Sequence, residues 1–410
     1  MTARQDRAKE IFLDALDQSD DPQAFVDQAC GEDLELRNRV QALLKAHQEA
    51  GDFLPTSKID VTVESDEPAN LDSTRSHQAT GSGPTIQIGP YSLLEVIGEG
   101  GMGTVWVASQ TKPLKRKVAL KLVKPGMDSR AVLARFEAER QALAMMDHPN
   151  IARVLDGGMT EQGRPYFAME LVRGITITEY CDQAELSIRE RLQLFGQVCS
   201  AVQHAHLKGI IHRDLKPSNI LVTEHDGQPV VKVIDFGLAK ALHGSHMLTD
   251  LSIHTSFGAV MGTPLYMAPE QLGVSALDID TRADTYSLGV ILYELLTGTT
   301  PIERERLKRA TLDEIRRILQ EEEPPRPSAR LSSSDSLPSQ AARRHVTPLK
   351  LTRLVRGELD WIIMKALEKD RNRRYESPSS LGQDLERYLD NEPVKAAPPS
   401  RVYQLRKLAR

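Results

Sequence analysis

The stretch His212-Arg213-Asp214-Leu215-Lys216-Pro217-Ser218-Asn219, followed along the chain by Asp235-Phe236-Gly237, decides the fold of this 410-residue protein. Carboxylate and amide oxygens suit Mg²⁺, and a lysine ammonium group neutralises phosphate oxygens as a point charge. A protein that moves a phosphoryl group needs these side chains, because it must hold a metal ion, position a hydroxyl and neutralise charge. Each tripeptide alone is common at loop ends, but the pair in this order strongly indicates that chemistry.

A glycine-rich segment precedes these motifs and reads Ile97-Gly98-Glu99-Gly100-Gly101-Met102-Gly103-Thr104-Val105. Its G-x-G-x-x-G spacing lets backbone amides approach phosphate oxygens without a Cβ in the way. The same spacing occurs in dinucleotide-binding turns, which open a helix directly after the last glycine. Here the β-branched and aromatic run Thr104-Val105-Trp106-Val107-Ala108 follows, which predicts a strand. We therefore expect residues 97–105 to form two strands over a glycine turn, as a lid on a nucleotide.

From Tyr91 to about Asp390, nearly three quarters of the chain, the sequence resembles a bacterial Hanks-type serine/threonine protein kinase. Two further matches are the segment Gly262–Glu270, which is similar to the end of a kinase activation loop, and Arg374, the expected ion-pair partner of Glu270. The resemblance implies an α+β, bilobal fold. A small antiparallel β-sheet lobe with one regulatory helix would span about 91–170, and a larger helical lobe about 171–390.

The resemblance also implies the roles of the central residues. Asp214 would accept the proton of the attacking hydroxyl, and Lys216 would lie against the transferring phosphate. Asn219 and Asp235 would hold Mg²⁺. Lys121, in the strand-like run from Lys117 to Val123, matches the family lysine that pairs the α- and β-phosphates of ATP.

The partner of Lys121 is expected to be a glutamate on the helix that follows. An apolar stripe runs through that helix at steps of four and three: Val132, Phe136, Leu143 and Met146. Glu139 falls within this stripe, whereas Glu137 points elsewhere. A carboxylate on an inward face is destabilising unless it meets a cation, so we expect Glu139 to pair with Lys121. An ordinary exposed glutamate is the alternative at either position.

Other site residues follow from the resemblance alone. The segment from Tyr166 to Val172 would line the adenine pocket, with Met169 at its back and the backbones of Glu170 and Val172 offering hydrogen bonds. Asp284 would support the catalytic loop from beneath. Lys216 and Thr263 favour serine or threonine over tyrosine as the acceptor.

Regulation is suggested by Arg213, whose positive charge next to Asp214 calls for an anion. A phosphorylated activation loop would supply one. The hydroxyls available in that segment are Thr249, Ser252, Thr255 and Ser256. Thr255 and Ser256 are the first choice because they lie a short turn before Gly262 and Thr263. The alternative is that each is an ordinary solvated loop residue.

Composition fits an ordinary enzyme. A net charge of −5 and a pI near 6.2 give no general affinity for nucleic acid. No run of eighteen apolar residues and no signal peptide is present in the sequence as given, so we expect a cytoplasmic protein without a membrane span. The three cysteines lack the spacing of a zinc site or a disulfide framework.

Composition also divides the chain. Residues 1–54 predict a helical extension whose apolar faces need a partner, either the catalytic domain or a second copy. Residues 55–89 predict a flexible linker. Within the catalytic domain, 91–390, we expect an exposed insertion at 324–347. The basic tail, 391–410, predicts a solvated helix end, although similar kinases often continue into a membrane span and a tether beyond Arg410 is the alternative.

Two functions are compatible with this pattern. The first is a kinase that uses ATP and Mg²⁺ to phosphorylate protein substrates, with a homodimer for autophosphorylation. The second is an inactive, kinase-shaped scaffold. Pseudokinases usually lose a residue equivalent to Lys121, Asp214 or Asp235, and all of these are present together with Asn219. Catalysis is therefore favoured, and the segment Gly262–Glu270 disfavours a small-molecule kinase.

Overall fold

The computed structural model describes residues 29–30, 33, 36–37, 40, 86–100, 103–124, 141, 143–236, 264–272, 279–400, 403 and 407. The chain divides into two compact units, residues 1–80 and 81–410. In the first unit, 29–30, 36–37 and 40 are helical. Among the described residues, no helix combines the length and the apolar character needed to cross a membrane.

The smaller lobe is a six-stranded sheet in the order β1-β2-β3-β4-β6-β5, and all of its neighbouring strands are antiparallel. The strands are β1 (Gln87–Ile88), β2 (Tyr91–Gly100), β3 (Gly103–Gln110), β4 (Arg116–Val123), β5 (Val154–Met159) and β6 (Pro165–Glu170). Val118 and Leu120 of β4 are fully buried, and Ala119 between them is buried as well, so both faces of this strand are covered. The expected β-sheet lobe is confirmed.

The two faces of this sheet pack into different cores. On one face, Tyr91 meets Tyr166 edge to face, and its hydroxyl donates to Asp156 Oδ2 at 2.8 Å. On the other face, Ala119 and Met169 belong to the main hydrophobic cluster, which continues into the helical lobe. The sheet is thus packed against the helical lobe through a continuous core.

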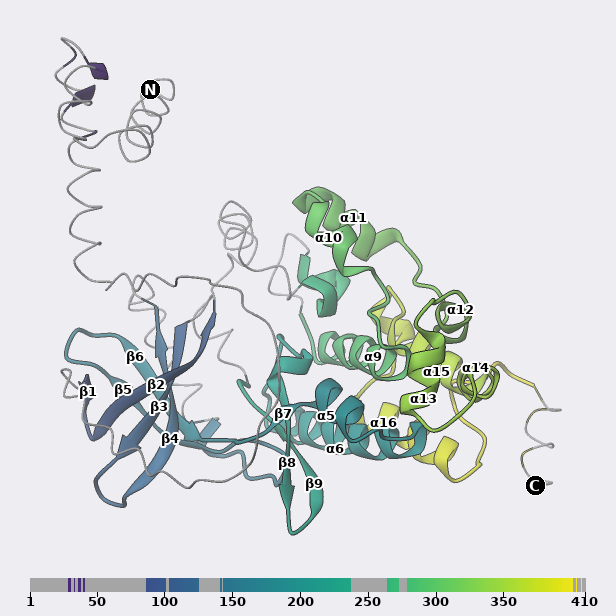
Figure 1. Ribbon diagram of the computed structural model, residues 1–410, viewed down its shortest axis with the longest axis horizontal. Helices are drawn as coiled ribbons and strands as arrows, with labels where there is room; N and C mark the ends of the chain where they lie inside the picture. The colour runs from purple at the N-terminus through teal and green to yellow at the C-terminus, as the bar shows by residue number, and fades with distance from the viewer. Residues whose placement is uncertain are drawn as a thin grey trace, which may run out of the picture. The chain divides into compact units, whose positions relative to one another are not determined.

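The larger lobe is mainly helical, with a small sheet in the order β7-β8-β9. Its strands and 3₁₀ turns are β7 (Ile175–Thr176), η1 (Pro217–Asn219), β8 (Ile220–His225), β9 (Gln228–Val233), η2 (Pro264–Tyr266), η3 (Pro269–Leu272) and η5 (Arg371–Arg373). Its helices are α5 (Ile177–Gln183), α6 (Ile188–Leu207), α9 (Arg282–Thr297), α10 (Arg304–Arg309), α11 (Leu312–Glu321), α12 (Pro327–Ser332), α13 (Leu337–Arg343), α14 (Pro348–Val355), α15 (Glu358–Ala366) and α16 (Pro378–Leu389). Figure 1 shows β7 to β9 between the six-stranded sheet and the helices.

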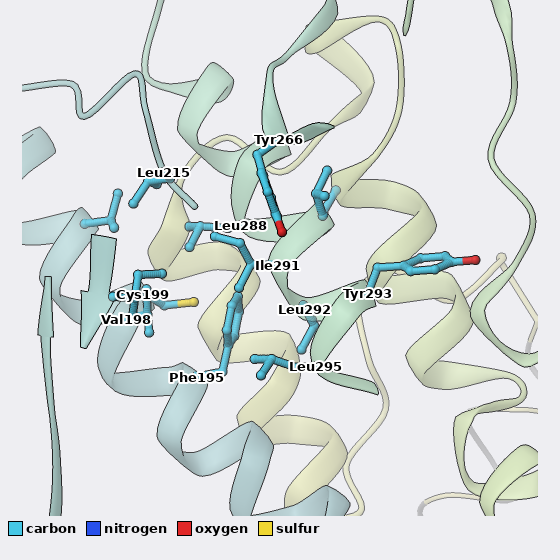
Figure 2. Packing of buried hydrophobic residues seen from close by; sticks show 14 of the residues in the cluster. Phe195, Val198, Cys199, Leu215, Tyr266, Leu288, Ile291, Leu292, Tyr293 and Leu295 are labelled. Atoms are coloured by element: carbon cyan, nitrogen blue, oxygen red, sulfur yellow. The ribbon is translucent and has the colours of Figure 1, made fainter. Parts of the chain in front are cut away.

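Helix α9 is the centre of the helical lobe. Its sequence is apolar on nearly every side, and almost all of its residues are buried. Figure 2 shows Leu288, Ile291 and Leu295 of α9 facing Phe195 and Val198 of α6. The helix ends at Gly298, whose left-handed φ of 72° and N–H bond to the Glu294 carbonyl are typical of a glycine C-cap.

The stretch 324–347, expected to be an exposed insertion, is only partly exposed. This stretch forms α12 and α13, and its residues Leu331, Ala341 and Arg344 are buried. Arg344 donates to the Leu295 carbonyl in the last turn of α9, which suits a cation at a helix C-terminus. The serine-rich and proline-rich composition of this stretch gave no indication of these buried residues.

The basic tail also differs from the expected solvated helix end. The backbone N–H groups of Lys395 and Ala396 each donate to the Asp384 carboxylate at 2.8 Å. Further on, Lys407 Nζ lies 2.9 Å from Glu358, and the Tyr403 hydroxyl donates to the same carboxylate. The described residues of the tail therefore form part of the helical lobe.

Two helix glycines provide a test of the packing around α9. A Cβ at Gly289 would lie 2.8 Å from Ala366 Cβ in α15, so we expect Gly289→Ala to lower the free energy of unfolding; the change should be about 1–3 kcal/mol. A Cβ at Gly196 in α6 would meet nothing within 4 Å. Gly196→Ala should instead raise the free energy of unfolding by about 0.5–1 kcal/mol, because alanine has the higher helix propensity. Denaturant titration of both variants measures the difference, and equal stability would contradict the close approach of α9 and α15.

Candidate active site

The glycine-rich segment forms the hairpin that the sequence predicts. Gly98 pairs with Val105, Glu99 with Thr104 and Gly100 with Gly103 across β2 and β3, so a strand follows the last glycine. This arrangement excludes a dinucleotide-binding turn, which would open a helix there. A Cβ at Gly103 would lie 2.2 Å from the Leu122 carbonyl oxygen, so only glycine fits.

Gly101 and Met102, at the tip of this hairpin, lie outside the described residues. Ile97 lies at an irregularity in β2, because the pairing register shifts between Val96 and Gly98. Its side chain is 50% exposed. Val105 on the paired strand packs against the main cluster that contains Ala119 and Met169. The hairpin therefore offers two apolar side chains, Ile97 and Val105, next to backbone that phosphate oxygens can approach.

The segment expected to line the adenine pocket connects the two lobes. Met169 is buried in the main cluster, and Glu170 ends β6. In the part of the chain that the structure describes, neither the N–H nor the carbonyl of Val172 makes a hydrogen bond. A Cβ at Gly174 would lie 2.3 Å from the Val222 carbonyl oxygen, which fixes the end of this segment against β8.

Lys121 is held at the interface of the two lobes. Its Nζ lies 2.9 Å from Asp235 Oδ2, and the lysine side chain is 7% exposed. Its backbone is fixed by pairing with Val105 on one side and Phe167 on the other. The predicted partner Glu139 lies outside the described residues, so that pairing stays a prediction.

Two side chains of the motif at 212–219 contact Asp214. Lys216 Nζ donates to Asp214 Oδ2 at 2.7 Å. The side-chain amide nitrogen of Asn219 donates to the Asp214 carbonyl at 2.8 Å. Because that nitrogen faces Asp214, the amide oxygen of Asn219 is the atom left for a metal ion.

Asp284 supports this loop from the first turn of α9. Its fully buried carboxylate accepts the backbone N–H groups of His212 and Arg213, each at 2.8 Å. His206 Nε2 lies 2.7 Å from the same carboxylate. Burial by itself would raise the pKa of Asp284, but the hydrogen bond and charge of His206 and the charge and N–H of His212 hold that pKa below its ordinary value. The expected supporting role of Asp284 is confirmed.

Ile234, directly after β9, links the loop that carries Asp214 to the second motif. The N–H of Ile234 donates to the Asn219 carbonyl at 3.0 Å, and His212 Nε2 lies 3.0 Å from the Ile234 carbonyl. The rings of His212 and Phe236 lie 4.7 Å apart between centroids. Asp235 and Asn219 are therefore fixed relative to each other. Together their oxygens form a hard donor set that fits Mg²⁺ or another divalent cation of that kind.

The segment after the activation loop is anchored to the same lobe. Arg374 makes two hydrogen bonds to Glu270, at 2.6 and 2.8 Å, as expected. Gln271 donates its side-chain amide to the Arg213 carbonyl at 2.8 Å, which joins this segment to the catalytic loop. Thr255 and Ser256 lie outside the described residues.

Sequence reasoning gave no role to His206, Gln271 or Lys232. His206 contacts Asp284 directly, and its position on the helix leading into the loop was the available signal. Gln271 follows a recognised motif residue, Glu270. Lys232 was marked only by its place in the strand before Asp235.

The chain matches the family model described as a protein kinase domain over residues 91–384. It is 35% identical over 313 residues to a probable serine/threonine-protein kinase of Streptomyces coelicolor, covering 75% of this chain and 41% of the relative. It is 41% identical over 250 residues to serine/threonine-protein kinase pkn3 of Myxococcus xanthus, covering 59% and 44%. The chain thus spans about two fifths of the length of these relatives.

A solved structure supports the fold. The crystal structure of the PknI kinase domain of Mycobacterium tuberculosis superimposes with a TM-score of 0.53 at 23% sequence identity. The match covers 76% of this chain and 100% of that domain.

The support of the loop by Asp284 is testable through stability. In Asp284→Asn the amide NH₂ would face one of two backbone N–H donors, so we expect a loss of about 3 kcal/mol in the free energy of unfolding near neutral pH. The folded-state pKa of Asp284 is depressed, so its contribution is present above the pKa of an ordinary aspartate, about 3.9, and is lost as pH falls below it.

Denaturant titration from pH 7 to pH 3 measures this contribution. The difference between wild type and Asp284→Asn should shrink toward the acid end. Asp335→Asn, at an exposed position, is the matched control and should change little. A difference of constant size across this range would contradict the ionised state of Asp284.

Proposed function

The chain belongs to the protein kinase family, among the bacterial Hanks-type serine/threonine kinases, and we propose that it transfers the γ-phosphate of ATP to serine or threonine hydroxyls of proteins. One observation carries this proposal. Lys121 bonds to Asp235, Asn219 bonds to Asp214, and Ile234 joins the two pairs through the Asn219 carbonyl. Each pair is thus held by a direct contact, and the two pairs are joined to each other through the backbone of Ile234.

The nucleotide would lie between the glycine hairpin and the helical lobe. The carbonyl of Glu170 and the backbone of Val172 would hold the adenine, with Met169 at the back of its pocket. Lys121, already in contact with Asp235, would meet the α- and β-phosphates as a positive charge. Backbone amides between Gly98 and Gly103 would surround the remaining phosphate oxygens.

Asp214 would orient the acceptor hydroxyl and take its proton. Lys216, which donates to Asp214 at 2.7 Å, would neutralise charge on the transferring group. The oxygens of Asn219 and Asp235 would hold Mg²⁺. A bound divalent ion would neutralise charge on the β- and γ-phosphate oxygens. The protein's contribution is mainly positioning, because the loop and the metal-binding residues are fixed to α9 and β9 before substrate arrives.

The inactive-scaffold alternative lacks support in this site. The three positions that pseudokinases usually lose are filled by Lys121, Asp214 and Asp235, and each of these side chains contacts a neighbouring side chain. Activity, substrates and partners are proposed for the whole protein from a chain that spans about two fifths of its relatives. We place the reaction in the cytoplasm, where ATP and protein substrates are available.

Regulation is proposed at the activation loop. Phosphorylation of Thr255 or Ser256, by a second copy of the chain in a transient homodimer, would supply an anion near Arg213. The backbone of Arg213 is already fixed by Asp284 and Gln271. An ordered loop would then complete the peptide-binding surface.

The catalytic proposal is tested by Asp214→Asn. We expect the rate of label transfer from radiolabelled ATP, to itself and to a generic protein substrate, to fall by about 100-fold or more, because the proton acceptor is lost. Calorimetric binding of Mg·ADP and the melting temperature should be retained. Equal labelling of wild type and variant would remove Asp214 from this role.

The regulatory proposal is tested by mass spectrometry after incubation with ATP and Mg²⁺. We expect phosphate on Thr255 or Ser256, and a lower activity in the double variant Thr255→Ala/Ser256→Ala. The double variant Thr249→Ala/Ser252→Ala is the matched control. Absence of phosphate between Thr249 and Thr263 would overturn the proposal.

A further inference from the structure

One ion pair lies outside the catalytic centre and joins two parts of it. Lys232 Nζ lies 2.9 Å from Oε1 and 3.1 Å from Oε2 of Glu170. Lys232 belongs to β9, in the helical lobe, and Glu170 is the last residue of β6, in the smaller lobe. The two residues are 62 positions apart in the chain, so this contact is a product of the fold.

Glu170 is held on two sides. Its carboxylate accepts the backbone N–H of Arg153 at 3.2 Å, and its own N–H donates to the Arg153 carbonyl at 2.8 Å. Lys232 binds the same carboxylate from the opposite lobe. The backbone of Glu170, proposed above to contact adenine, is therefore positioned partly by a cation on β9.

On the β9 side of the ion pair, the chain continues from Lys232 to the proposed metal-binding residue Asp235. Val233 follows Lys232, donates to the Asn150 carbonyl and accepts the N–H of Ala152. Ile234 donates to the Asn219 carbonyl, and Asp235 comes next. No residue between Lys232 and Asp235 lacks a backbone hydrogen bond to another segment. A displacement at Lys232 would therefore be transmitted to Asp235.

This pair differs from an ordinary surface ion pair. The side chain of Lys232 is 17% exposed and that of Glu170 is 34% exposed. For comparison, Lys308 and Glu305 of α10 pair at 2.6 Å with 46% and 68% exposure, within a single helix. Exposed pairs such as Lys308–Glu305 contribute little to stability. The Lys232–Glu170 pair is less exposed, makes two contacts and joins the two lobes, so it can fix their relative position at this point.

We propose that Lys232 is a positioning residue for the nucleotide: by binding the Glu170 carboxylate it sets the separation between the adenine-binding backbone and Asp235. The adenine contact and the metal contact can then form at the same time on one ATP molecule. This inference rests on the proposed function, because it takes the adenine-binding backbone of Glu170 and the metal-binding residue Asp235 as assigned there.

The first test is Lys232→Met, which removes the charge and keeps most of the side-chain volume. We expect the KM for ATP and the calorimetric Kd for Mg·ADP to rise about 3- to 10-fold, with kcat changed about twofold or less and the KM for a peptide substrate unchanged. Glu170→Gln keeps the shape of the partner side chain. It should likewise raise the KM for ATP and the Kd for Mg·ADP while leaving kcat and the peptide KM nearly unchanged.

Two further variants separate positioning from general damage. The exchanged pair Glu170→Lys/Lys232→Glu restores opposite charges and should recover at least half of the lost Mg·ADP affinity. Lys308→Met breaks the exposed pair on α10 and should change neither constant. Melting temperatures of all variants report whether each one folds like wild type.

Several results would overturn the proposal. If folded Lys232→Met and Glu170→Gln bind Mg·ADP as tightly as wild type, the pair has only a structural role. If either variant has a raised kcat, the pair slows the reaction and does not position the nucleotide. Lack of recovery in the exchanged pair would also contradict it. If wild type binds Mg·ADP but transfers no phosphate, the proposed function fails, while the binding measurements still decide the role of Lys232.

Discussion

The arrangement of the residues around Asp214 depends on one buried carboxylate. Asp284 lies in the first turn of α9, and its carboxylate is fully buried. It accepts two successive backbone N–H groups of the loop that carries Asp214. A buried charge is tolerable only where hydrogen bonds replace water, and here the loop backbone and His206 supply them. The same requirement that keeps Asp284 ionised therefore fixes the position of the catalytic loop, so the core of the helical lobe determines the geometry of the site.

A series of contacts connects that loop to the smaller lobe. The Asn219 carbonyl binds Ile234, which places Asp235, and Asp235 meets Lys121 of the smaller lobe. Lys121 is fixed in turn by its position in β4, between two paired strands. The lobes also share one hydrophobic cluster, so packed side chains continue from the smaller lobe into the helical lobe. The Glu170–Lys232 pair adds a second, electrostatic link across the same boundary.

Local pattern explains what the sequence could predict. The glycine hairpin follows from its glycine spacing and from the β-branched residues after it, and the structure contains it. The contacts of Asp284 and Arg374 follow from the resemblance to the kinase family, and the structure contains these contacts too. Contacts between distant segments left no such signal. The burial of Arg344 depends on the end of α9, and the contacts of the tail depend on Asp384, so composition alone gave no indication of either. The Lys121–Glu139 pairing and the activation-loop hydroxyls remain predictions.

Amide hydrogen exchange of the native protein tests most directly whether Asp284 fixes the loop. The N–H groups of His212 and Arg213 are bound to a buried carboxylate, so they should exchange as slowly as the backbone of α9. Asp226 and Gly227, in the exposed turn between β8 and β9, provide the fast reference within the same protein. Slow exchange at both loop amides is the predicted result. Exchange at the rate of the turn would contradict the account.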